Sequence, residues 1–184
     1  MSTEQNVYLI GPMGVGKTTI GKSLARQLRL EFVDADQEIE KHTGVSIATI
    51  FDIEGEEAFR VREKTMIEKL TTRRGIVLAT GGGVILDEGN RNNLRKSGTV
   101  VYLHASVDLQ FERTRNNKDR PLLNQGDDRR AILEALMAER DPFYRAEADY
   151  VIATDGQSPQ AVARHIAREL MTLSLIHISE PTRP

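Results

Sequence analysis

The sequence predicts an α/β protein in which helices cover a sheet of parallel strands, and three observations carry that prediction. Short apolar runs alternate along the chain with segments of helical periodicity. A glycine-rich segment joins the first apolar run to the first helical pattern. Residues 76–80 form an uninterrupted apolar run, as in strands buried on both faces of a parallel sheet. The 184 residues suffice for one domain with an adequate core.

The composition argues against several classes of protein. The formal net charge is −2, so no large basic field attracts nucleic acid or an anionic membrane. The chain has no cysteine, which excludes disulfides and a thiol nucleophile. No run of about 18 apolar residues occurs, and the first six residues do not resemble a signal peptide. We therefore expect a soluble cytoplasmic protein without a nucleic-acid or membrane partner. We also expect a monomer, although the composition does not determine the oligomeric state.

The first element is a strand, a glycine loop and a helix. Residues 9–19, LIGPMGVGKTT, carry the spacing G-x-x-x-x-G-K-T that is typical of a phosphate-binding P-loop. Residues 7–10 are apolar, and Ile20, Leu24 and Leu28 then recur every fourth residue, as on one helix face. Glycines allow close approach of a ligand, and the backbone N–H groups and the helix N-terminus attract phosphate.

The P-loop pattern assigns roles to two side chains. The Lys17 ammonium is expected to reach the β- and γ-phosphates of a nucleotide, and the Thr18 hydroxyl to ligate Mg²⁺. The alternative is a glycine-rich turn that merely precedes a helix. The surrounding strand and helix favour phosphate binding.

A second strand is predicted over residues 31–36, and it ends in Asp34 and Asp36. Residues two apart on an extended chain share a face, and ligands bind at the carboxyl edge of such sheets. One carboxylate could hold Mg²⁺ through water, and the other could meet a substrate hydroxyl. The alternative interpretation is a helix N-cap followed by a solvated acid.

Three helical segments are expected next. Residues 37–43 form a short helix closed by Gly44, Ser46 caps another, and a longer helix follows Gly55. In the longer helix, Arg60 lies at the margin of the apolar stripe, from which its guanidinium could enter a cleft and bind a carboxylate. A surface arginine paired with a glutamate is the alternative.

The strand at residues 76–80 runs directly into Gly81, Gly82 and Gly83. Three glycines at this edge either let a ligand lie against bare backbone or only make a tight turn, and the sequence does not decide between them. No acid ends this strand. The carboxylate for a metal must therefore come from elsewhere, which favours Asp34.

The next elements are a helix over residues 87–96, a strand over 99–104 and a helix capped by Ser106. Residues 113–126 are highly charged and lack periodicity, so we interpret them as a mobile loop. In an enzyme that transfers phosphoryl groups, such a loop would close over the phosphates and supply stabilising charge. A solvated loop without a role is the alternative.

Residues 127–139 read as a helix with Arg140 at its end, where Asp141 and Pro142 stop it. A second arginine there could also bind an anion. A fifth strand spans 149–154, and Ser158 and Pro159 begin the last helix.

We expect residues 1–172 to form a single domain. From residue 173 the pattern breaks, and SLIHISEPTRP has neither helical spacing nor a capping signal. We interpret residues 173–184 as a non-native C-terminal extension and leave it out of the fold.

From Asn6 to Leu170 the chain resembles the shikimate kinases. The resemblance rests on the segments GPMGVGKTTIG, FVDADQEIE, FDIEGEEAFR, LATGGGV, RPLL and ERDPFY. Many kinases share the P-loop, but the combination with the other segments is far more specific. The resemblance implies ATP-dependent phosphorylation of the 3-hydroxyl of shikimate, with Mg²⁺, on the way to chorismate. It also implies a three-layer α/β/α P-loop kinase fold with five parallel strands in the order 2-3-1-4-5 and a lid over about residues 113–126.

The resemblance assigns site residues by motif. The ATP phosphates would be bound by Gly14, Val15, Gly16, Lys17, Thr18 and Thr19. The metal would be held by Thr18 and, through water, by Asp34. Shikimate would be bound by Asp36, Arg60, Gly82 and Arg140. Arg120 would be the lid arginine, Gln157 would lie by the adenine, and the catalytic side chains would be Lys17, Asp36 and Arg120.

Two rival functions use the same P-loop. One is another small-molecule kinase, for a sugar acid or a nucleotide. The other is a nucleotide-binding regulator without catalysis, which would have no use for Asp36, Arg60 and Arg140 together.

Overall fold

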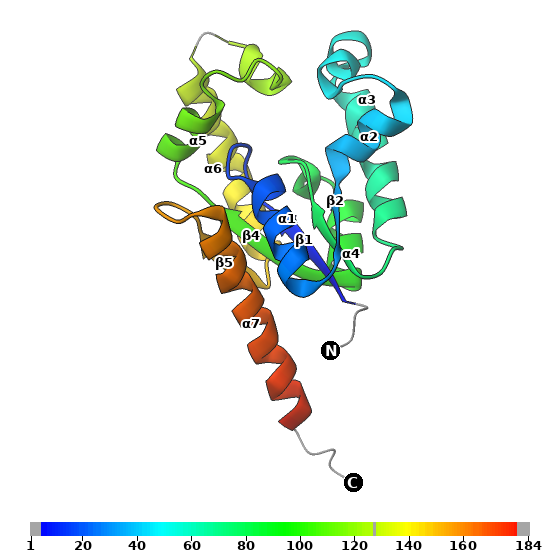
Figure 1. Cartoon of the computed structure of the whole chain (residues 1–184). Helices are drawn as coiled ribbons and strands as arrows, with labels where there is room; N and C mark the ends of the chain where they lie inside the picture. Colours follow the sequence, from blue (N-terminus) through cyan, green and yellow to red (C-terminus); the bar gives the residue numbers. More distant parts are fainter. Residues whose placement is uncertain (1–4, 127, 180–184) are drawn as a thin grey trace.

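The computed structural model describes residues 5–126 and 128–179, with side chains described up to residue 173 of the last helix. Five parallel strands form one sheet in the order β2-β3-β1-β4-β5, with helices on both faces (Figure 1). The predicted fold class and strand order are confirmed.

The strands are β1 (Asn6–Ile10), β2 (Glu31–Asp34), β3 (Ile76–Ala79), β4 (Gly98–His104) and β5 (Tyr150–Ala153). The helices are α1 (Lys17–Leu28), α2 (Ala35–Thr43), α3 (Ile47–Leu70), α4 (Glu88–Ser97), α5 (Val107–Thr114), α6 (Arg129–Glu147) and α7 (Pro159–Ser179). Two short 3₁₀ turns, η1 (Val84–Leu86) and η2 (Pro121–Asn124), complete the described elements.

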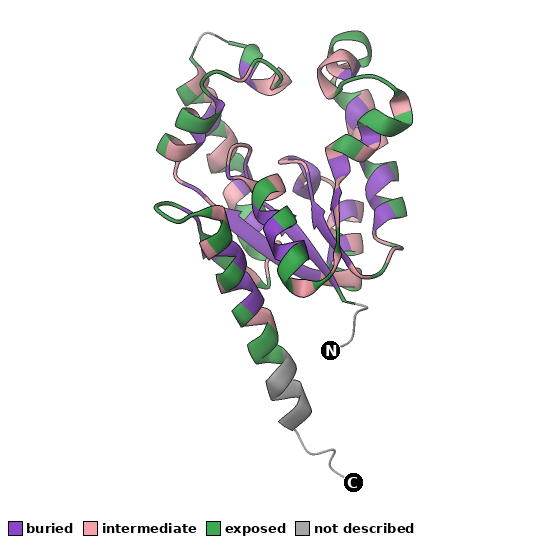
Figure 2. Ribbon diagram, in the orientation of Figure 1, coloured by how far each residue is buried: buried purple, intermediate pink, exposed green. Residues whose placement is uncertain are grey.

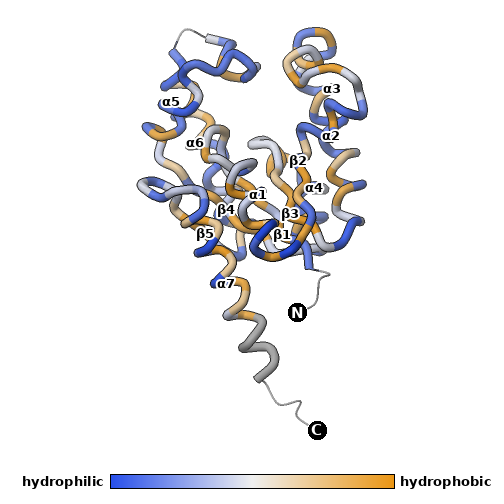
Figure 3. Tube along the Cα trace, viewed as in Figure 1, coloured by the Kyte–Doolittle hydropathy of each residue, from blue (hydrophilic) through white to orange (hydrophobic). Residues whose placement is uncertain are grey.

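The sheet is buried on both faces, which is why its strands read as apolar runs (Figure 2). Alternate residues of β1 enter different cores. Tyr8 packs in the core that α3, α4 and α6 share with the sheet. Leu9 packs in the other core, with α1 and α7. In Figure 3 the most hydrophobic stretches accordingly lie along the central strands, whereas the upper helices and loops are largely hydrophilic.

The start of α2 differs from the prediction. The strand β2 ends at Asp34, whose carboxylate accepts a hydrogen bond from the Gln37 N–H at 3.1 Å and thereby caps α2. Asp36 therefore lies in the first helical turn, and the argument that both acids share one face of a strand is wrong. The two carboxylates still lie near the P-loop, because the helix begins at the carboxyl edge of the sheet.

The two helices predicted around Gly55 are confirmed, although they form one kinked element. Ser46 caps α3 by accepting from the Thr49 N–H at 3.1 Å. At Gly55 the backbone turns non-helical, with φ 86° and ψ 172°, a conformation suited to glycine.

The prediction that Pro142 ends its helix is wrong, because α6 continues to Glu147. Packing outweighs the lost backbone hydrogen bond at this position. Beyond the proline, Tyr144 is fully buried and stacks on Tyr102, with ring centroids 4.9 Å apart. The Tyr102 hydroxyl also donates to Asp141 at 2.6 Å. The predicted helix start at residue 127 lies outside the described residues; Asp128 caps the helix that is seen.

The helix α7 continues to Ser179, so the expected loss of helical structure from residue 173 is wrong for residues 173–179. Residues 180–184 lie outside the described part of the chain, and the interpretation of 173–184 as non-native stays a prediction. In the part of the chain that the structure describes, none of the helices combines the length and the apolar character needed to cross a membrane.

The close contact between α1 and the sheet gives a test of this packing. A Cβ atom on Gly21 would lie 2.6 Å from the Phe32 ring and 3.2 Å from Leu9. Gly21→Ala should therefore lower the free energy of unfolding by about 1–2 kcal/mol, although alanine is the better helix former. Denaturant unfolding measures it. In the control Gly126→Ala, the atom nearest to the added Cβ is the Cδ1 of Ile132 at 3.4 Å, an ordinary van der Waals contact, and we expect no loss. Equal effects of the two substitutions would contradict the packing described.

Candidate active site

The P-loop between β1 and α1 has the geometry of an anion-binding nest. Gly16 stands at the N-terminus of α1 with φ 94°. A Cβ atom on Gly11 would lie 2.4 Å from the carbonyl oxygen of Leu103, so only glycine fits where the loop crosses β4. Lys17 is the first residue of α1, which places its side chain beside the loop.

Lys17 is held inside this loop. Its Nζ donates to the carbonyl oxygens of Gly11 at 2.6 Å and Pro12 at 2.8 Å. Burial, and next the charge of Arg120, lower the pKa of Lys17 to about 7, against the opposing effect of Asp36. An anion bound in the loop would restore the charged form.

Thr18 and Asp34 present neighbouring oxygens at the mouth of the loop. The Thr18 hydroxyl donates to the Asp34 carboxylate at 2.8 Å. Among the described residues, no group of three or more His, Asp or Glu side chains could hold a metal. One hydroxyl and one carboxylate fit Mg²⁺, which usually keeps waters and takes its other ligands from phosphates.

Two cavities meet at this edge of the sheet. One, of about 390 Å³, is lined by Asp34, Arg113 and the P-loop residues Gly14, Gly16, Lys17, Thr18 and Thr19. The other, of about 260 Å³, is lined by residues of α3, the glycine segment, the lid and α6. The residues that line both are Met13, Asp36, Gly81, Gly82 and Arg120. A group that enters from one cavity therefore meets the other at Asp36 and Arg120.

The three glycines after β3 provide space for charged side chains. A Cβ atom on Gly83 would lie 2.4 Å from the Arg60 guanidinium, and one on Gly82 would lie 3.3 Å from an Arg140 nitrogen. The glycines also turn the chain, since the Val84 N–H donates to the Gly81 carbonyl at 3.2 Å. The tight turn predicted as one alternative is thus confirmed, whereas contact between a ligand and the bare backbone of these glycines stays a prediction.

The two arginines of the smaller cavity are held differently. Arg60 is partly exposed and donates to Glu63 at 2.9 Å and to Glu56 at 3.3 Å, so the predicted glutamate partner is present. Arg140 is 4% exposed and lies in the middle of α6 rather than at its end. Next to it, the Tyr144 hydroxyl donates to the Gly82 carbonyl at 2.5 Å and ties α6 to the glycine segment.

Several buried polar atoms of this cavity have no hydrogen-bond partner among the residues that the structure describes. They are Asp36 Oδ1, Arg60 Nε, Glu63 Oε2 and Arg140 Nε. Buried polar atoms in native proteins are almost always paired. The cavity is therefore built for a polar ligand with both donors and acceptors.

Asp36 is the residue of this cavity whose shifted pKa best suits a catalytic role. Burial raises its pKa to about 6, and repulsion from Glu63 and Asp34 adds to the effect, while Lys17 and Arg120 oppose it. Burial likewise raises the pKa of Glu63. A carboxylate with a pKa near 6 is suited to accept a proton from a hydroxyl at neutral pH.

Most predicted site residues are brought together, but Gln157 is not. It follows β5, lines neither cavity and donates to the Ala153 carbonyl at 2.7 Å. The lid does reach the site, since Arg120, Pro121 and Leu122 line the smaller cavity. The assignment of catalytic roles to Lys17, Asp36 and Arg120 stays a prediction.

Three side chains at or near the site escaped sequence analysis. Glu63 lies one helical turn after Arg60, a spacing that could have revealed it. Arg113 donates to the Val15 carbonyl at 2.8 Å and so braces the P-loop. Arg129 donates to the carbonyls of Arg115 at 2.8 Å and Asn117 at 2.7 Å, holding the base of the lid. No local pattern in the sequence marks the contacts of Arg113 and Arg129.

Comparisons with known proteins agree with this geometry. A family model described as shikimate kinase matches residues 13–171. The chain is 54% identical to the shikimate kinase of Pseudoalteromonas atlantica over 170 residues, covering 92% of this chain and 99% of that protein. It is 51% identical to the shikimate kinase of Buchnera aphidicola, covering 92% of this chain and 98% of that protein.

Among solved structures, the chain is similar to a shikimate kinase from Acinetobacter baumannii in complex with shikimate. The TM-score is 0.91 at 46% sequence identity, and the match covers 94% of this chain and 96% of that one.

The raised pKa of Asp36 predicts that this side chain lowers the stability of the unliganded protein. The folded state, with a pKa of about 6, binds more protons than the unfolded state, where the value is 3.8. Its contribution to stability is therefore present below about pH 4 and is lost as the pH rises through 6. Asp36→Asn should raise the free energy of unfolding by about 3 kcal/mol at pH 8 and not at pH 4.

Denaturant unfolding at both pH values measures this change. The control is Asp52→Asn, an exposed acid of α3, which should alter stability by less than about 0.5 kcal/mol at either pH. A loss of stability in Asp36→Asn at pH 8 would refute the assignment.

Proposed function

The chain belongs to the shikimate kinase family, and from that premise we propose that it transfers the γ-phosphate of ATP to the 3-hydroxyl of shikimate. One observation carries the proposal beyond family membership. A cavity built for phosphate and a cavity built for an acidic, polyhydroxylated ligand share Asp36 and Arg120. An acceptor hydroxyl and a terminal phosphate could meet only at that junction.

The larger cavity would take the triphosphate of ATP. Gly14, Gly16 and Thr19 line this cavity, and their backbone N–H groups, with that of Val15 between the two glycines, would surround the phosphates at the N-terminus of α1. Lys17 would exchange its carbonyl partners for phosphate oxygens. Mg²⁺, which neutralises developing phosphate charge when bound, would be held by Thr18 and, through water, by Asp34.

The smaller cavity would take shikimate, which has one carboxylate and three hydroxyls. The guanidinium groups of Arg60 and Arg140 flank the glycine segment and are the candidates for the carboxylate. Gly82 leaves room for the ring to approach the backbone. Asp36 would accept a hydrogen bond from the reacting hydroxyl.

The transfer then follows from the positions of three side chains. The 3-hydroxyl gives its proton to Asp36 as its oxygen attacks the γ-phosphorus, and the bond to the bridging oxygen of ADP breaks. General-base assistance of this kind contributes about 10²–10⁴-fold in rate. Lys17 lines the larger cavity and Arg120 lines both, so these two cations would stabilise the charge on the transferring group.

Both cavities are lined by one chain, so the proposal needs no second subunit, and we propose that the protein acts as a monomer in the cytoplasm. Gln157 is proposed to contact the adenine once nucleotide is bound, after release of its Ala153 partner.

The rival functions are separated by one coupled assay of ADP release with ATP and Mg²⁺. We expect release only with shikimate, and not with D-gluconate or adenosine monophosphate. Release with either of those would favour another small-molecule kinase. Nucleotide binding with no acceptor-dependent release would favour a regulator.

The pKa of Lys17 predicts proton uptake when nucleotide binds. At pH 8 a group with a pKa of about 7 is mostly neutral in the unliganded protein, and phosphate binding favours its charged form. ADP binding at pH 8 should therefore take up close to one proton, and at pH 6 almost none. Calorimetry in two buffers of different ionisation enthalpy measures this uptake.

Lys17→Met should abolish the uptake and reduce kcat by about 10³-fold or more. Wild-type binding without proton uptake at pH 8, or a variant that turns over normally, would count against the role of Lys17.

Arg140 should act on shikimate and not on ATP. Arg140→Lys keeps the charge but loses the planar pair of donors, so the KM for shikimate should rise about 10–100-fold. The KM for ATP should change less than about threefold. Arg145→Lys is the control, since Arg145 lies on the same helix outside both cavities. Equal increases in both KM values would argue against a carboxylate-binding role.

A further inference from the structure

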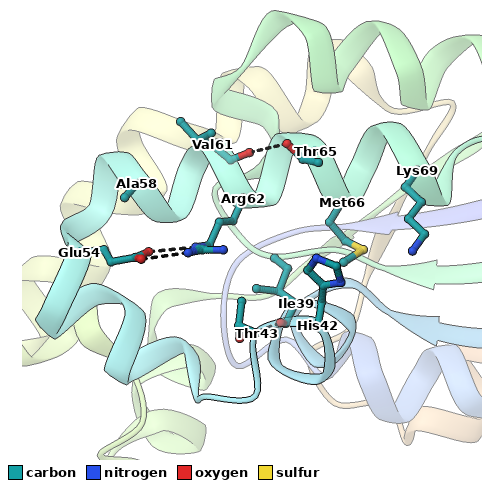
Figure 4. Close-up of a pocket in the computed structure, with 10 residues that line it drawn as sticks. All are labelled: Ile39, His42, Thr43, Glu54, Ala58, Val61, Arg62, Thr65, Met66 and Lys69. Atoms are coloured by element: carbon teal, nitrogen blue, oxygen red, sulfur yellow. Dashed lines mark hydrogen bonds and ion pairs between the residues drawn. The ribbon is translucent and has the colours of Figure 1, made fainter.

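A third cavity lies between α2 and α3, and at about 770 Å³ it is larger than either cavity of the active site (Figure 4). None of the residues that line it lines the other two cavities. Its volume is in the range of small-molecule binding sites. We call it the α2–α3 groove.

The floor and part of the wall of the groove are apolar. Ile39 and Met66 are buried beneath it, and Ala58 and Val61 line it from α3. Val61 is 64% exposed, which is unusual for a valine in the middle of a helix. The α2–α3 groove therefore presents hydrophobic surface that the protein itself leaves open to solvent.

The hydroxyl groups in the groove are already paired with backbone. Thr65 donates to the Val61 carbonyl at 3.1 Å, and Thr43 donates to the Ile39 carbonyl at 2.9 Å. Each hydroxyl is thereby turned toward its own helix. The methyl groups are the parts left to contact a ligand.

The charges of the groove are asymmetric. Figure 4 shows Glu54 and Arg62 paired at one end, and Lys69 at the other, with His42 and Met66 between. Both Arg62–Glu54 hydrogen bonds measure 2.9 Å, so this pair neutralises itself. Across the described residues, neither His42 nor Lys69 forms an ion pair. The end of the groove at Lys69 is therefore a free cationic site beside an apolar floor.

We propose that the α2–α3 groove is a second binding site, for a small organic anion whose apolar body lies on Ile39, Val61 and Met66. Its anionic group lies at Lys69 and His42. An apolar surface with one unpaired cationic end is complementary to an amphipathic carboxylate or sulfonate. The inference itself rests on the groove alone, and only the use of ADP and shikimate to fill the other two cavities in the test rests on the proposed function.

The probe for the test is 1-anilinonaphthalene-8-sulfonate, an amphipathic anion with environment-sensitive fluorescence. It is titrated into the full-length protein with saturating ADP and shikimate, which occupy the other two cavities. We expect one bound probe with a Kd on the order of 10–100 μM. The neutral analogue N-phenyl-1-naphthylamine should bind at least about fivefold more weakly.

Two pairs of variants locate the site. Val61→Glu places a carboxylate in the groove and should weaken binding at least about tenfold. Ile53→Glu is its control, because Ile53 is 78% exposed and does not line the groove. Lys69→Gln should weaken binding about threefold or more, whereas Lys64→Gln, which changes a lysine paired with Asp87, should not. Circular dichroism confirms that each variant is folded.

Methyl NMR gives an independent location. The Ile39, Val61 and Met66 methyl resonances should shift during the titration, and that of Ile53 should not. The proposal is overturned if ADP and shikimate displace the probe, if Val61→Glu binds as the wild type does, or if the neutral analogue binds equally well.

Discussion

Buried charge at the carboxyl edge of the sheet, paired only in part, is the constraint on which the rest of this structure depends. Asp36 lies between two cations, Lys17 and Arg120, and two acids, Asp34 and Glu63, and its pKa is raised to about 6. The pKa of Lys17 in turn is lowered to about 7. Such groups destabilise a folded protein unless the surrounding structure holds them in place. Ligands that pair these groups would recover that free energy as binding.

The fold provides the support in three places. The P-loop holds Lys17 through backbone carbonyls, and Arg113 braces the loop from α5. The glycine segment after β3 lets guanidinium groups lie against bare backbone. The helix α6 places Arg140 in the site because Tyr144 is buried against Tyr102 and its hydroxyl donates a hydrogen bond to the Gly82 carbonyl. A flexible support in any of these places would loosen the geometry at the junction of the two cavities.

Local signals in the sequence were enough to predict the P-loop, the five strands and most helix caps. The P-loop was readable because its function depends on consecutive residues, and Ser46 and Gly44 mark helix ends by local hydrogen bonding. The C-terminal end of α6 could not be predicted from local signals. Pro142 is a local helix-stop signal, and the long-range packing of the tyrosines overrides it.

Local signals also predict only part of the site, because some of its residues are placed by long-range contacts. Arg60, Arg140 and Asp36 were identified, but the reasoning for Asp36 assumed an extended chain, whereas it lies in the first turn of α2. Arg113 and Arg129 act through carbonyls far along the chain or in the lid, and no local pattern marks such contacts. Only the orphaned polar atoms of the folded protein reveal that the smaller cavity is built for a ligand.

The most direct measurement is a crystal structure of the protein with ADP and shikimate bound together. The account predicts the shikimate carboxylate between Arg60 and Arg140, and one ring hydroxyl about 3 Å from Asp36, on the side that faces the nucleotide. A ring bound outside the smaller cavity, or a carboxylate in contact with neither arginine, would contradict it.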